Sequence, residues 1–357
     1  MEITATAVLE KKEFYDMYKN IYGLDLGTHE IKVYDKNKDI TWKQRNVIAL
    51  KEKDAFLTIG NKAYEMFGKT PSDIQVISPM KHGAIASFEH MQQLLTTLIT
   101  DAKLFKRGSD YFVALPTDLT EVEKKAFYDL VLNAPNKAKS VRMVERNMAD
   151  ALGAGVDVFG TKGTVIVNFG GATTELSVLL AGGMVVNRLL KIGGEDFDLA
   201  TTNYIRRNHD LLIGHSTAEQ LRKSFGVSLQ DSKSKIRVSG KNILSGLPVK
   251  IEIPSHSVET AIKEPLYEIF SAIKAMVGRI PSNIHQEILE HGIILTGGLA
   301  RMSGLTNEIK SELHLRAHVC EAPEFSVANG IKKIIQNKKT YRKFTYSMID
   351  EDYRWLR

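Results

Sequence analysis

The sequence predicts an α/β fold built from two related halves around a ligand cleft. Two glycine-containing hairpins, at 21–33 and 165–178, resemble each other in the order of their residues. Internal repetition of this kind indicates a duplicated architecture. Stretches with strand and helix patterns follow both hairpins. The chain has 357 residues and 43% hydrophobic content, which suffices for two or three domains with sizeable cores.

The second hairpin, Val165 to Val178, reads VIVNFGGATTELSV, an apolar strand, a Gly-Gly turn, two threonines and an alternating strand. Gly170 and Gly171 can adopt positive φ and bring backbone N–H groups onto a phosphate. Thr173 and Thr174 add hydroxyls that could donate to phosphate oxygens or reach a metal through water. Taken alone, such a pattern is more often an ordinary turn.

The first hairpin, 21–33, reads IYGLDLGTHEIKV and repeats the apolar run, the glycine, the threonine and the alternation. Aligning Asp25 with Asn168 makes the second turn two residues longer than the first. Gly27 and Thr28 then match the first glycine and a threonine of the second turn. Two such hairpins facing each other across a cleft would hold a di- or triphosphate from both sides.

The other elements of the first half follow from apolar periodicity and turn signals. Residues 1–20 carry a partial helical stripe that predicts a short amphipathic helix, but acidic residues dilute its positive face and disfavour membrane insertion. Thr120 and Glu123 form a capping box for a helix that runs to Leu132. The remaining elements expected here are a helix at 62–67, a helix at 88–105, a strand at 111–116, a strand at 141–144 and a small-residue helix ending at 153–155.

The second half is expected to continue from its hairpin with further strands and helices. The expected elements are a hairpin at 179–190, a helix at 197–207, a polar and partly strand-like segment at 210–254, an amphipathic helix at 258–277, a strand at 291–296 and a helix at 303–313. Gly297 and Gly298, between the last two, let the backbone approach a flat ligand or a phosphate.

Composition excludes several classes of protein. The net charge of +6 and the pI near 9.0 are modest, and the basic residues indicate either a solvated face or an anionic partner such as a membrane surface or an acidic protein. Nucleic acid is not expected, because no recognition helix or stacking motif accompanies the charge. No apolar run is long enough to span a bilayer and no signal peptide opens the chain, so we expect a cytoplasmic protein. A single cysteine, Cys320, excludes an internal disulfide.

Several stretches together resemble a known family. The two hairpins and ILTGGLARMSGL at 294–305 resemble the phosphate 1, phosphate 2 and adenosine motifs of the actin, Hsp70 and sugar-kinase superfamily. Four further stretches resemble its MreB branch, the bacterial actin-like cell-shape proteins. They are GKTPSDIQVISPMKHGAIASF at 68–88, TEVEKKAF at 120–127, GGEDFDLA at 193–200 and IGHSTAEQLRKSFG at 213–226. The resemblance runs in order from about Gly23 to about Gly330 and assigns no role to 340–357.

The resemblance implies an actin-like fold, in which each half has a large subdomain with a five-stranded mixed sheet and a small subdomain, around a nucleotide cleft. It divides the chain into an N-terminal extension at 1–20, subdomain IA at 21–50, 81–157 and 328–357, subdomain IB at 51–80, subdomain IIA at 158–193 and 257–327, and subdomain IIB at 194–256. The small-residue helix ending at 153–155 is then the hinge between the halves.

The resemblance also implies ATP and Mg²⁺ as ligands, with Asp25 holding the metal through its water ligands. The implied nucleotide-binding residues are Asp25, Gly27, Thr28, His29, Glu30, Gly170, Gly171, Ala172, Thr173, Gly194, Glu219, Arg222, Gly297, Gly298, Leu299 and Ala300. Glu219 and Arg222, three apart on one helix face, suit the ribose and adenine, or else form a surface ion pair. Gly194 belongs to a helix start that is either an N-cap or a nucleotide contact.

Three positions depart from the family pattern. Asn168 stands where MreB proteins have an aspartate, so it carries no charge and cannot take a proton. Arg146 stands where a glutamate that orients the attacking water is expected. Glu145 lies one residue earlier, about 100° around a helix. Leu299 replaces a third glycine of the adenosine motif. Thr173 carries a hydroxyl and is a further candidate catalytic residue.

Two explanations are open: the helix shifts its register so that Glu145 orients the water, or the chain lacks this carboxylate. We favour the second, because the number of residues from this position to Gly153 and Gly155 is the same as in the family. Arg146 would then be a surface arginine at the cleft edge or an internal arginine finger on the γ-phosphate. Losing an orienting group commonly costs about 10²–10⁴ in rate, so we expect weak ATP hydrolysis.

The sequence therefore predicts an ATP-binding, actin-like cytoskeletal protein that polymerises into protofilaments and supports cell shape or cell mechanics. Its expected partner is itself, with actin-like paralogues, other cytoskeletal proteins and peripheral contact with the inner face of the cell membrane as further options. The alternative is a sugar or carboxylate kinase of the same superfamily, which needs an extra substrate lobe and a catalytic base. An Hsp70-like chaperone would need a C-terminal peptide-binding domain.

Overall fold

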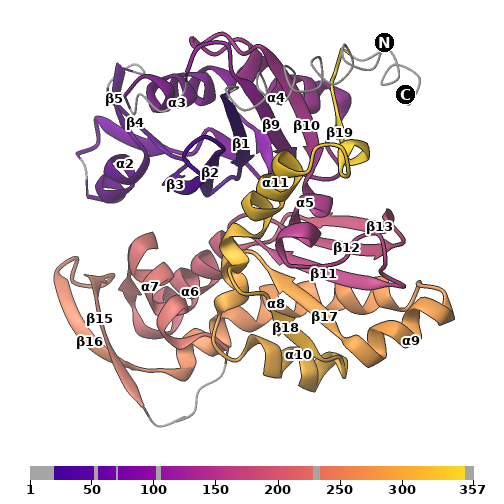
Figure 1. Cartoon of the computed structure of the whole chain (residues 1–357). Coiled ribbons are helices and arrows are strands. Elements are labelled where there is room, and N and C mark those ends of the chain that lie inside the picture. Colours follow the sequence, from indigo (N-terminus) through magenta and orange to yellow (C-terminus); the bar gives the residue numbers. More distant parts are fainter. Residues whose placement is uncertain (1–19, 52–54, 70, 102–105, 228–233, 350–357) are drawn as a thin grey trace, which may run out of the picture.

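Both predicted hairpins are present, and each forms the centre of a large sheet. The computed structural model describes residues 20–51, 55–69, 71–101, 106–227 and 234–349. Within them, the first sheet has the strand order β19-β10-β9-β1-β2-β3 and the second the order β13-β12-β11-β17-β18. Figure 1 shows one sheet in the upper half of the molecule and the other in the lower half.

The strands of the first sheet are β1 (Ile21–Leu26), β2 (Glu30–Asp35), β3 (Ile40–Arg45), β9 (Asp110–Leu115), β10 (Ser140–Glu145) and β19 (Thr345–Tyr346). Those of the second are β11 (Thr164–Phe169), β12 (Thr174–Leu180), β13 (Gly183–Leu190), β17 (Ile293–Thr296) and β18 (Ala317–Val319).

The two sheets repeat one another strand by strand, as the sequence predicted. In the first, β1 pairs antiparallel with β2 and parallel with β9, and β9 pairs parallel with β10. In the second, β11 pairs antiparallel with β12 and parallel with β17, and β17 pairs parallel with β18. Strands β3 and β13 extend the two hairpins on their outer sides. The shared order β3-β2-β1-β9-β10 and β13-β12-β11-β17-β18 identifies a duplicated unit.

The first sheet has six strands where five were expected, because residues near the end of the chain add a strand to this sheet. Thr345 and Tyr346 form β19, which pairs antiparallel with β10. Phe344 beside them is 3% exposed and belongs to the core between the halves. A two-residue strand has no sequence periodicity that could reveal it, which is why this stretch had no predicted role.

Three smaller sheets complete the described strands. One has the order β5-β4-β6, another β14-β15-β16, and β7 pairs with β8. Their strands are β4 (Ile48–Lys51), β5 (Ala55–Ile59), β6 (Ile74–Ile77), β7 (Met80–Lys81), β8 (Ala84–Ile85), β14 (Leu211–Leu212), β15 (Lys235–Asn242) and β16 (Pro248–Pro254). The exact division into four subdomains stays a prediction.

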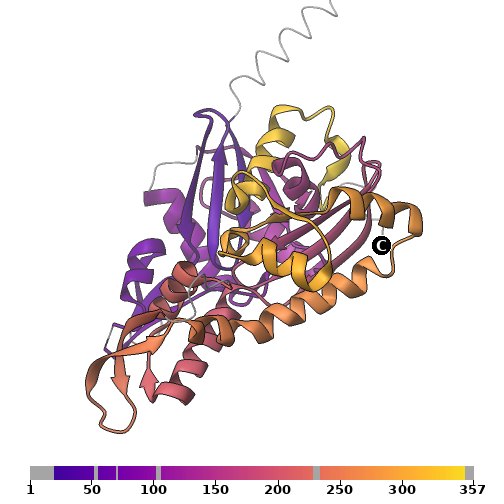
Figure 2. The same cartoon turned by 90° about the horizontal axis from the view of Figure 1, so that it is seen from below.

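The helices lie close to the predicted positions, apart from two, at Ser282–His291 and Ser326–Gln336, that the sequence did not predict. They are α2 (Gly60–Met66), α3 (Phe88–Asp101), α4 (Glu121–Leu132), α5 (Arg146–Gly153), α6 (Gly194–His209), α7 (His215–Phe225), α8 (His256–Val277), α9 (Ser282–His291), α10 (Leu305–Leu313) and α11 (Ser326–Gln336). Three 3₁₀ helices, η1 (Gly298–Arg301), η2 (Pro323–Phe325) and η3 (Arg342–Phe344), lie among the described residues. Figure 2 shows the long helix α8, in orange, running along one side of the second half.

The capping box at the start of α4 is confirmed. The Thr120 hydroxyl accepts from the Glu123 backbone N–H at 3.3 Å, and the Glu123 carboxylate accepts from the Thr120 N–H at 2.7 Å. These two bonds satisfy donors that a helix start would otherwise leave unpaired. The apolar stripe of α3 is also buried as predicted, at Met91, Leu94, Leu95, Leu98 and Ile99.

Apolar side chains form a core in each half and another where the halves meet. The core between the halves takes residues from both large sheets and from α5 and α11, including Ile21, Val144, Met148, Leu152, Ile166, Val327 and Ile331. Figure 1 shows α5 and α11 at this junction. The burial of this apolar surface stabilises the arrangement of the two halves.

Helices α5 and α11 touch through their backbones. A Cβ added at Gly153 would lie 1.6 Å from the carbonyl oxygen of Ser326, and one added at Gly330 would lie 1.6 Å from that of Ala149. No side chain fits in either place, because both neighbours are main-chain atoms. The two glycines therefore fix how close the helices lie at the junction.

Within the described residues, every helix is too short or too polar to cross a membrane. The predicted amphipathic helix at 1–20 lies outside the described residues apart from its last position.

The junction yields a stability prediction. Gly153→Ala should lower the unfolding free energy by about 3 kcal/mol or more, because the methyl group can be accommodated only by moving a backbone. The matched control is Gly214→Ala, where an added Cβ meets nothing within 4 Å and φ is −80°. Its expected cost is at most about 1 kcal/mol. Chemical denaturation of both variants checks this, and equal losses would contradict the account of the junction.

Candidate functional site

A cavity lies between the tips of the two hairpins, and most of the predicted nucleotide-binding residues line it. Those in the lining are Asp25, Gly27, Thr28, His29, Glu30, Gly170, Gly171, Ala172, Thr173, Gly194, Glu219, Arg222, Gly297, Gly298 and Leu299, together with the predicted catalytic residues Arg146 and Asn168. Two predicted residues do not line it. Glu145 has an exposed side chain at the end of β10, and Ala300 is buried within η1.

The two hairpin tips have the same length, which corrects the predicted alignment. Leu26 pairs with Ile31 in the first hairpin, and Phe169 pairs with Thr174 in the second. The prediction matched threonine to threonine, whereas the strand register matches Thr28 to Gly171. Backbone pairing decides equivalence in a hairpin, because each strand position is fixed by its partner.

The first tip is held by hydrogen bonds to its backbone. The Gly27 N–H donates to the Glu30 carbonyl at 3.1 Å, and the Asn46 amide donates to the Gly27 carbonyl at 2.9 Å. The Thr28 hydroxyl accepts from the Gly83 N–H at 2.9 Å. A Cβ at Gly27 would lie 2.7 Å from the Glu30 carbonyl oxygen, so this turn closes only around glycine.

The second tip lies directly against the first. A Cβ at Gly171 would lie 2.5 Å from the Cβ of His29 in the first tip, and one at Gly170 would lie 2.7 Å from the Thr173 carbonyl oxygen. The Thr174 hydroxyl, expected to be available to a phosphate, instead donates to the Ile192 carbonyl at 2.8 Å. Thr173 alone of this pair lines the cavity.

Helix α6 begins on the second tip. The N–H groups of Gly194 and Glu195 donate to the carbonyls of Gly170 and Gly171 at 3.1 and 2.8 Å. The Asp196 carboxylate accepts from the Gly193 N–H at 2.8 Å, which is the N-cap that the sequence offered as one explanation. The nucleotide contact of Gly194 stays a prediction.

Arg146, the first residue of α5, lies between the hairpins and pairs with an acid from each. Its guanidinium is 3.3 Å from the Asp25 carboxylate of β1 and 3.3 Å from the Glu175 carboxylate of β12. Its side chain is only 12% exposed, so the interpretation as a surface arginine is wrong. The helix register therefore presents Arg146 to the cavity and Glu145 away from it.

These acids belong to equivalent cross-strand pairs. Asp25 stands opposite Lys32 in the first hairpin, and Asn168 stands opposite Glu175 in the second. Lys32 Nζ lies 3.7 Å from the Asp25 carboxylate. Lys32 and Glu175 were not predicted as site residues, although cross-strand pairing of the two hairpins could have indicated both.

Asn168 is hydrogen-bonded to a buried acid of α5. Its side-chain amide donates to the Asp150 carboxylate at 3.0 Å, and the Thr296 hydroxyl donates to the same group at 2.6 Å. The Ser326 hydroxyl donates to it as well. Burial raises the pKa of Asp150, and these hydrogen bonds oppose that rise. An amide suits position 168 because a carboxylate there would face Asp150.

The residues predicted for the ribose and adenine are held by partners of opposite charge. Arg222 donates to Asp198 at 2.7 and 3.2 Å. Glu219 pairs with Arg45 at 3.1 Å and with Lys223 at 2.7 Å. The two residues do not pair with each other, so the predicted surface ion pair is wrong.

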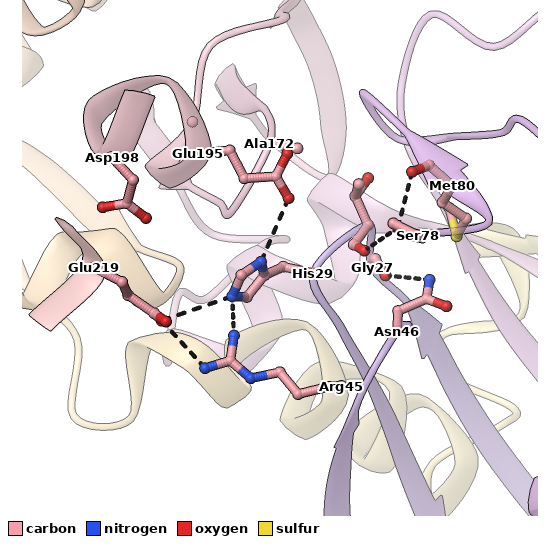
Figure 3. Close-up of polar contacts among 12 residues, drawn as sticks. Gly27, His29, Arg45, Asn46, Ser78, Met80, Ala172, Glu195, Asp198 and Glu219 are labelled. Atoms are coloured by element: carbon pink, nitrogen blue, oxygen red, sulfur yellow. Dashed lines mark hydrogen bonds and ion pairs between the residues drawn. The ribbon is translucent and has the colours of Figure 1, made fainter. Parts of the chain in front are cut away.

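Several of these contacts cross the cavity from one half to the other. Figure 3 shows Arg45 and His29 from the first half facing Glu219 and Glu195 from the second. His29 Nδ1 is 3.4 Å from Glu195, and its Nε2 is 3.8 Å from Glu219. The Tyr64 hydroxyl of α2 also donates to Glu219.

Opposite charges and hydrogen bonds outweigh the burial of Glu219. Burial opposes its ionised form, but bonds from Lys223 and Tyr64 and the charge of Arg45 hold its pKa well below the usual range. Glu219 is therefore a permanent anion at neutral pH, and it ties β3 and α2 of the first half to α7 of the second. Arg45 was not predicted as a site residue, because its partner lies 174 positions away.

The turn after β17 forms the remaining wall. Gly297 has φ +79°, and a Cβ there would lie 2.3 Å from the Phe169 carbonyl oxygen of the second hairpin. The η1 turn that follows places Gly298 and Leu299 in the lining. Leu299 is 4% exposed, so the residue that replaces a third glycine fills space beside the cavity.

The buried Glu175 provides a pH prediction. Burial raises its pKa from 4.5 to about 7, although Arg146 favours the ionised form. The folded chain therefore retains a proton that the unfolded chain has lost, so this group makes stability fall as pH rises from 4.5 to 7. Glu175→Gln cannot titrate, and its unfolding free energy should fall less over that window, by roughly 2–3 kcal/mol.

Urea denaturation at pH 5 and pH 8 measures this difference. Glu321→Gln, at an exposed position, controls for the substitution itself. If Glu175→Gln and the parent chain lose stability equally between the two pH values, the assignment of a raised pKa is wrong.

Comparisons with known proteins agree with this architecture. The family model described as MreB/Mbl protein matches residues 19–343. The cell shape-determining protein Mbl of Bacillus subtilis is 33% identical over 326 residues, which cover 90% of this chain and 97% of that protein. The cell shape-determining protein MreB of Escherichia coli K12 is 34% identical over 334 residues, covering 91% and 96%.

A solved structure shares the fold over nearly its whole length. The crystal structure of MreB 5 of Spiroplasma citri bound to AMPPNP has a TM-score of 0.85 and 26% identity, and it covers 91% of this chain and 98% of its own. The predicted actin-like fold is thus confirmed, and nothing in the comparisons favours the kinase alternative. The chain belongs to the MreB/Mbl family of actin-like cytoskeletal proteins.

Proposed function

We propose that this chain binds an adenine nucleotide between its two hairpin tips and assembles with copies of itself into protofilaments that support cell shape or cell mechanics. The family, whose curated relatives are cell shape-determining proteins, supports the cellular role. The AMPPNP bound to MreB 5 of Spiroplasma citri supports the class of ligand.

The observation that carries the nucleotide proposal is the meeting of both tips at one cavity. Gly27, Gly170 and Gly171 keep the two hairpin turns free of side chains at this point, and Gly171 lies against the first tip. Backbone N–H groups in such turns suit phosphate oxygens. Lys32 and Arg146 add two positive charges to the same lining, which favours an anion.

The hinge offers a mechanism for the nucleotide to act on assembly. The tips belong to different halves, so a phosphate bound by both binds more tightly when the halves are close. A ligand shifts such an equilibrium only through its different affinity for the two forms. The Arg45–Glu219 and His29–Glu195 contacts cross the same cavity and favour the closed form as well.

We also propose that ATP hydrolysis is weak, because the carboxylates that line the cavity are already paired with other groups. Among the described lining residues, five acids form an ion pair with a lysine or an arginine, and Glu195 lies 3.4 Å from His29 Nδ1; the five are Asp25, Glu30, Asp198, Glu219 and Glu324. A carboxylate bound to a cation is a poor acceptor for a proton from water. Arg146 occupies the position expected for the water-orienting glutamate, so we propose that hydrolysis is slow.

Further proposals concern the partners of the protein and its location in the cell. Self-association is the primary one. Further proposals are contacts with actin-like paralogues or other cytoskeletal proteins and peripheral contact with the inner face of the cell membrane, and the net charge of +6 favours an anionic partner.

The proposed function is tested by nucleotide binding together with high-speed pelleting. The parent chain should bind ATP and pellet in its presence. Gly171→Ala should weaken ATP binding by about tenfold or more and reduce pelleting, because its methyl group separates the two tips. Gly214→Ala, outside the cavity, is the matched control and should behave as the parent. A parent chain that neither binds ATP nor pellets would refute the proposal.

Slow hydrolysis is tested by phosphate release with ATP and Mg²⁺. The double variant Arg146→Glu with Glu175→Gln supplies the carboxylate that the family resemblance expects there, and its second change removes one of the two buried acids that Arg146 pairs with. Phosphate release per bound ATP should rise by roughly 10²-fold. Arg146→Gln adds no carboxylate and should show no such rise per bound ATP. An equal rate per bound ATP for the parent and the double variant would mean that the missing carboxylate does not limit hydrolysis. A large fall per bound ATP in Arg146→Gln would instead identify Arg146 as an arginine finger.

A further inference from the structure

We propose that Arg146, together with Lys32, takes the place of the divalent cation expected at the phosphate end of the cavity, so that this chain binds its nucleotide without Mg²⁺. The inference rests on the proposed nucleotide binding and adds to it the way in which the phosphate charge is neutralised.

Asp25, the residue predicted to hold Mg²⁺ through water, is already enclosed by positive charges. One of its carboxylate oxygens is 3.3 Å from the Arg146 guanidinium, and the other is 3.7 Å from Lys32 Nζ. Its side chain is 3% exposed. Mg²⁺ binds through one or two carboxylates, substrate phosphates and several waters, and a carboxylate that already faces two positive charges is a poor partner for a hydrated divalent cation.

Glu30 of the same hairpin also lines the cavity, but it is paired with Lys43 and Lys32. Asn168, at the position equivalent to Asp25, is uncharged, and its amide is bound to Asp150. Glu175, opposite Asn168, is paired with Arg146 and does not line the cavity. The residues present therefore do not fit a Mg²⁺ ion at this point.

The Arg146 guanidinium lies between the two hairpins, in the position of a bridging cation. It contacts Asp25 from the first hairpin through Nη2 and Glu175 from the second through Nη1. Its Nε is buried and has no hydrogen-bond partner among the described residues. Guanidinium groups remain charged at all physiological pH values and bind phosphate in the same fork geometry as carboxylate.

At this end of the cavity the positive charges already occupy the place beside Asp25. Lys32 and Arg146 line the cavity and are paired with Asp25, Glu30 and Glu175. A phosphate between the tips could bind to the same two cations. A Mg²⁺ ion beside Asp25 would have to displace one of them.

The test compares nucleotide affinity with excess Mg²⁺ and with EDTA, using fluorescent ATP and ADP analogues on the full chain. For the parent, we expect dissociation constants that differ by less than about threefold between the two conditions. Arg146→Gln should lose about tenfold or more in EDTA, because a charged hydrogen bond to phosphate is removed. Arg142→Gln is the matched control. Arg142 lies on β10, bonds Thr345 and does not line the cavity, so this variant should bind as the parent does.

The outcomes are distinct. Binding by the parent only in Mg²⁺ would overturn this inference and leave the proposed nucleotide binding intact. Binding in neither condition would refute the proposed function itself. Because Arg146→Gln leaves two buried acids without a partner, it could fail to fold. The shift of the parent's melting temperature by ATP in EDTA and in Mg²⁺ then decides alone, with equal shifts expected and a shift confined to Mg²⁺ contradicting the inference.

Discussion

The direct backbone contact between α5 and α11 is the constraint on which the site depends. Gly153 and Gly330 leave no room between the helices, so α5 has one position at the junction of the two halves. Its first residue, Arg146, is thereby held between the hairpin of one half and the hairpin of the other. The core residues that surround both helices, such as Met148 and Ile331, are fully or almost fully buried and secure this placement.

The position of Arg146 has an energetic consequence. Two carboxylates, from Asp25 and Glu175, are buried beside it, and buried charges are tolerated only when they are paired. Each comes from a different half, so the same ion pairs that neutralise the site also connect the halves. Asp150, one turn along α5, binds Asn168, Thr296 and Ser326 in a similar way. Helix α5 thus connects the two halves and also supplies charged groups to the site.

Much of the fold could be predicted because its signals are local. The capping box at Thr120 and the apolar stripe of α3 depend on residues three or four apart, and both are present in the structure. The duplicated hairpins were recognised from short motifs, and the two sheets repeat in the same strand order. Strand β19 was missed because two residues carry no periodicity.

The site was predicted less completely, since its charges pair over long sequence distances. Arg45 meets Glu219, and Arg146 meets both Asp25 and Glu175, through contacts that only the packing of the halves creates. Sequence reasoning located Arg146 at the cleft, as a surface arginine or an arginine finger, but did not predict its two acidic partners. Lys32 could have been predicted as a site residue, because it stands opposite Asp25 in a hairpin whose short tip fixes the strand register.

The most direct test of the central claim is a crystal structure of the chain grown with ATP and Mn²⁺, whose anomalous scattering locates the metal. The account predicts a nucleotide between the hairpin tips, the Arg146 guanidinium in contact with phosphate oxygens, and no Mn²⁺ peak beside Asp25. A Mn²⁺ peak at Asp25, with Arg146 turned away from the phosphates, would contradict it.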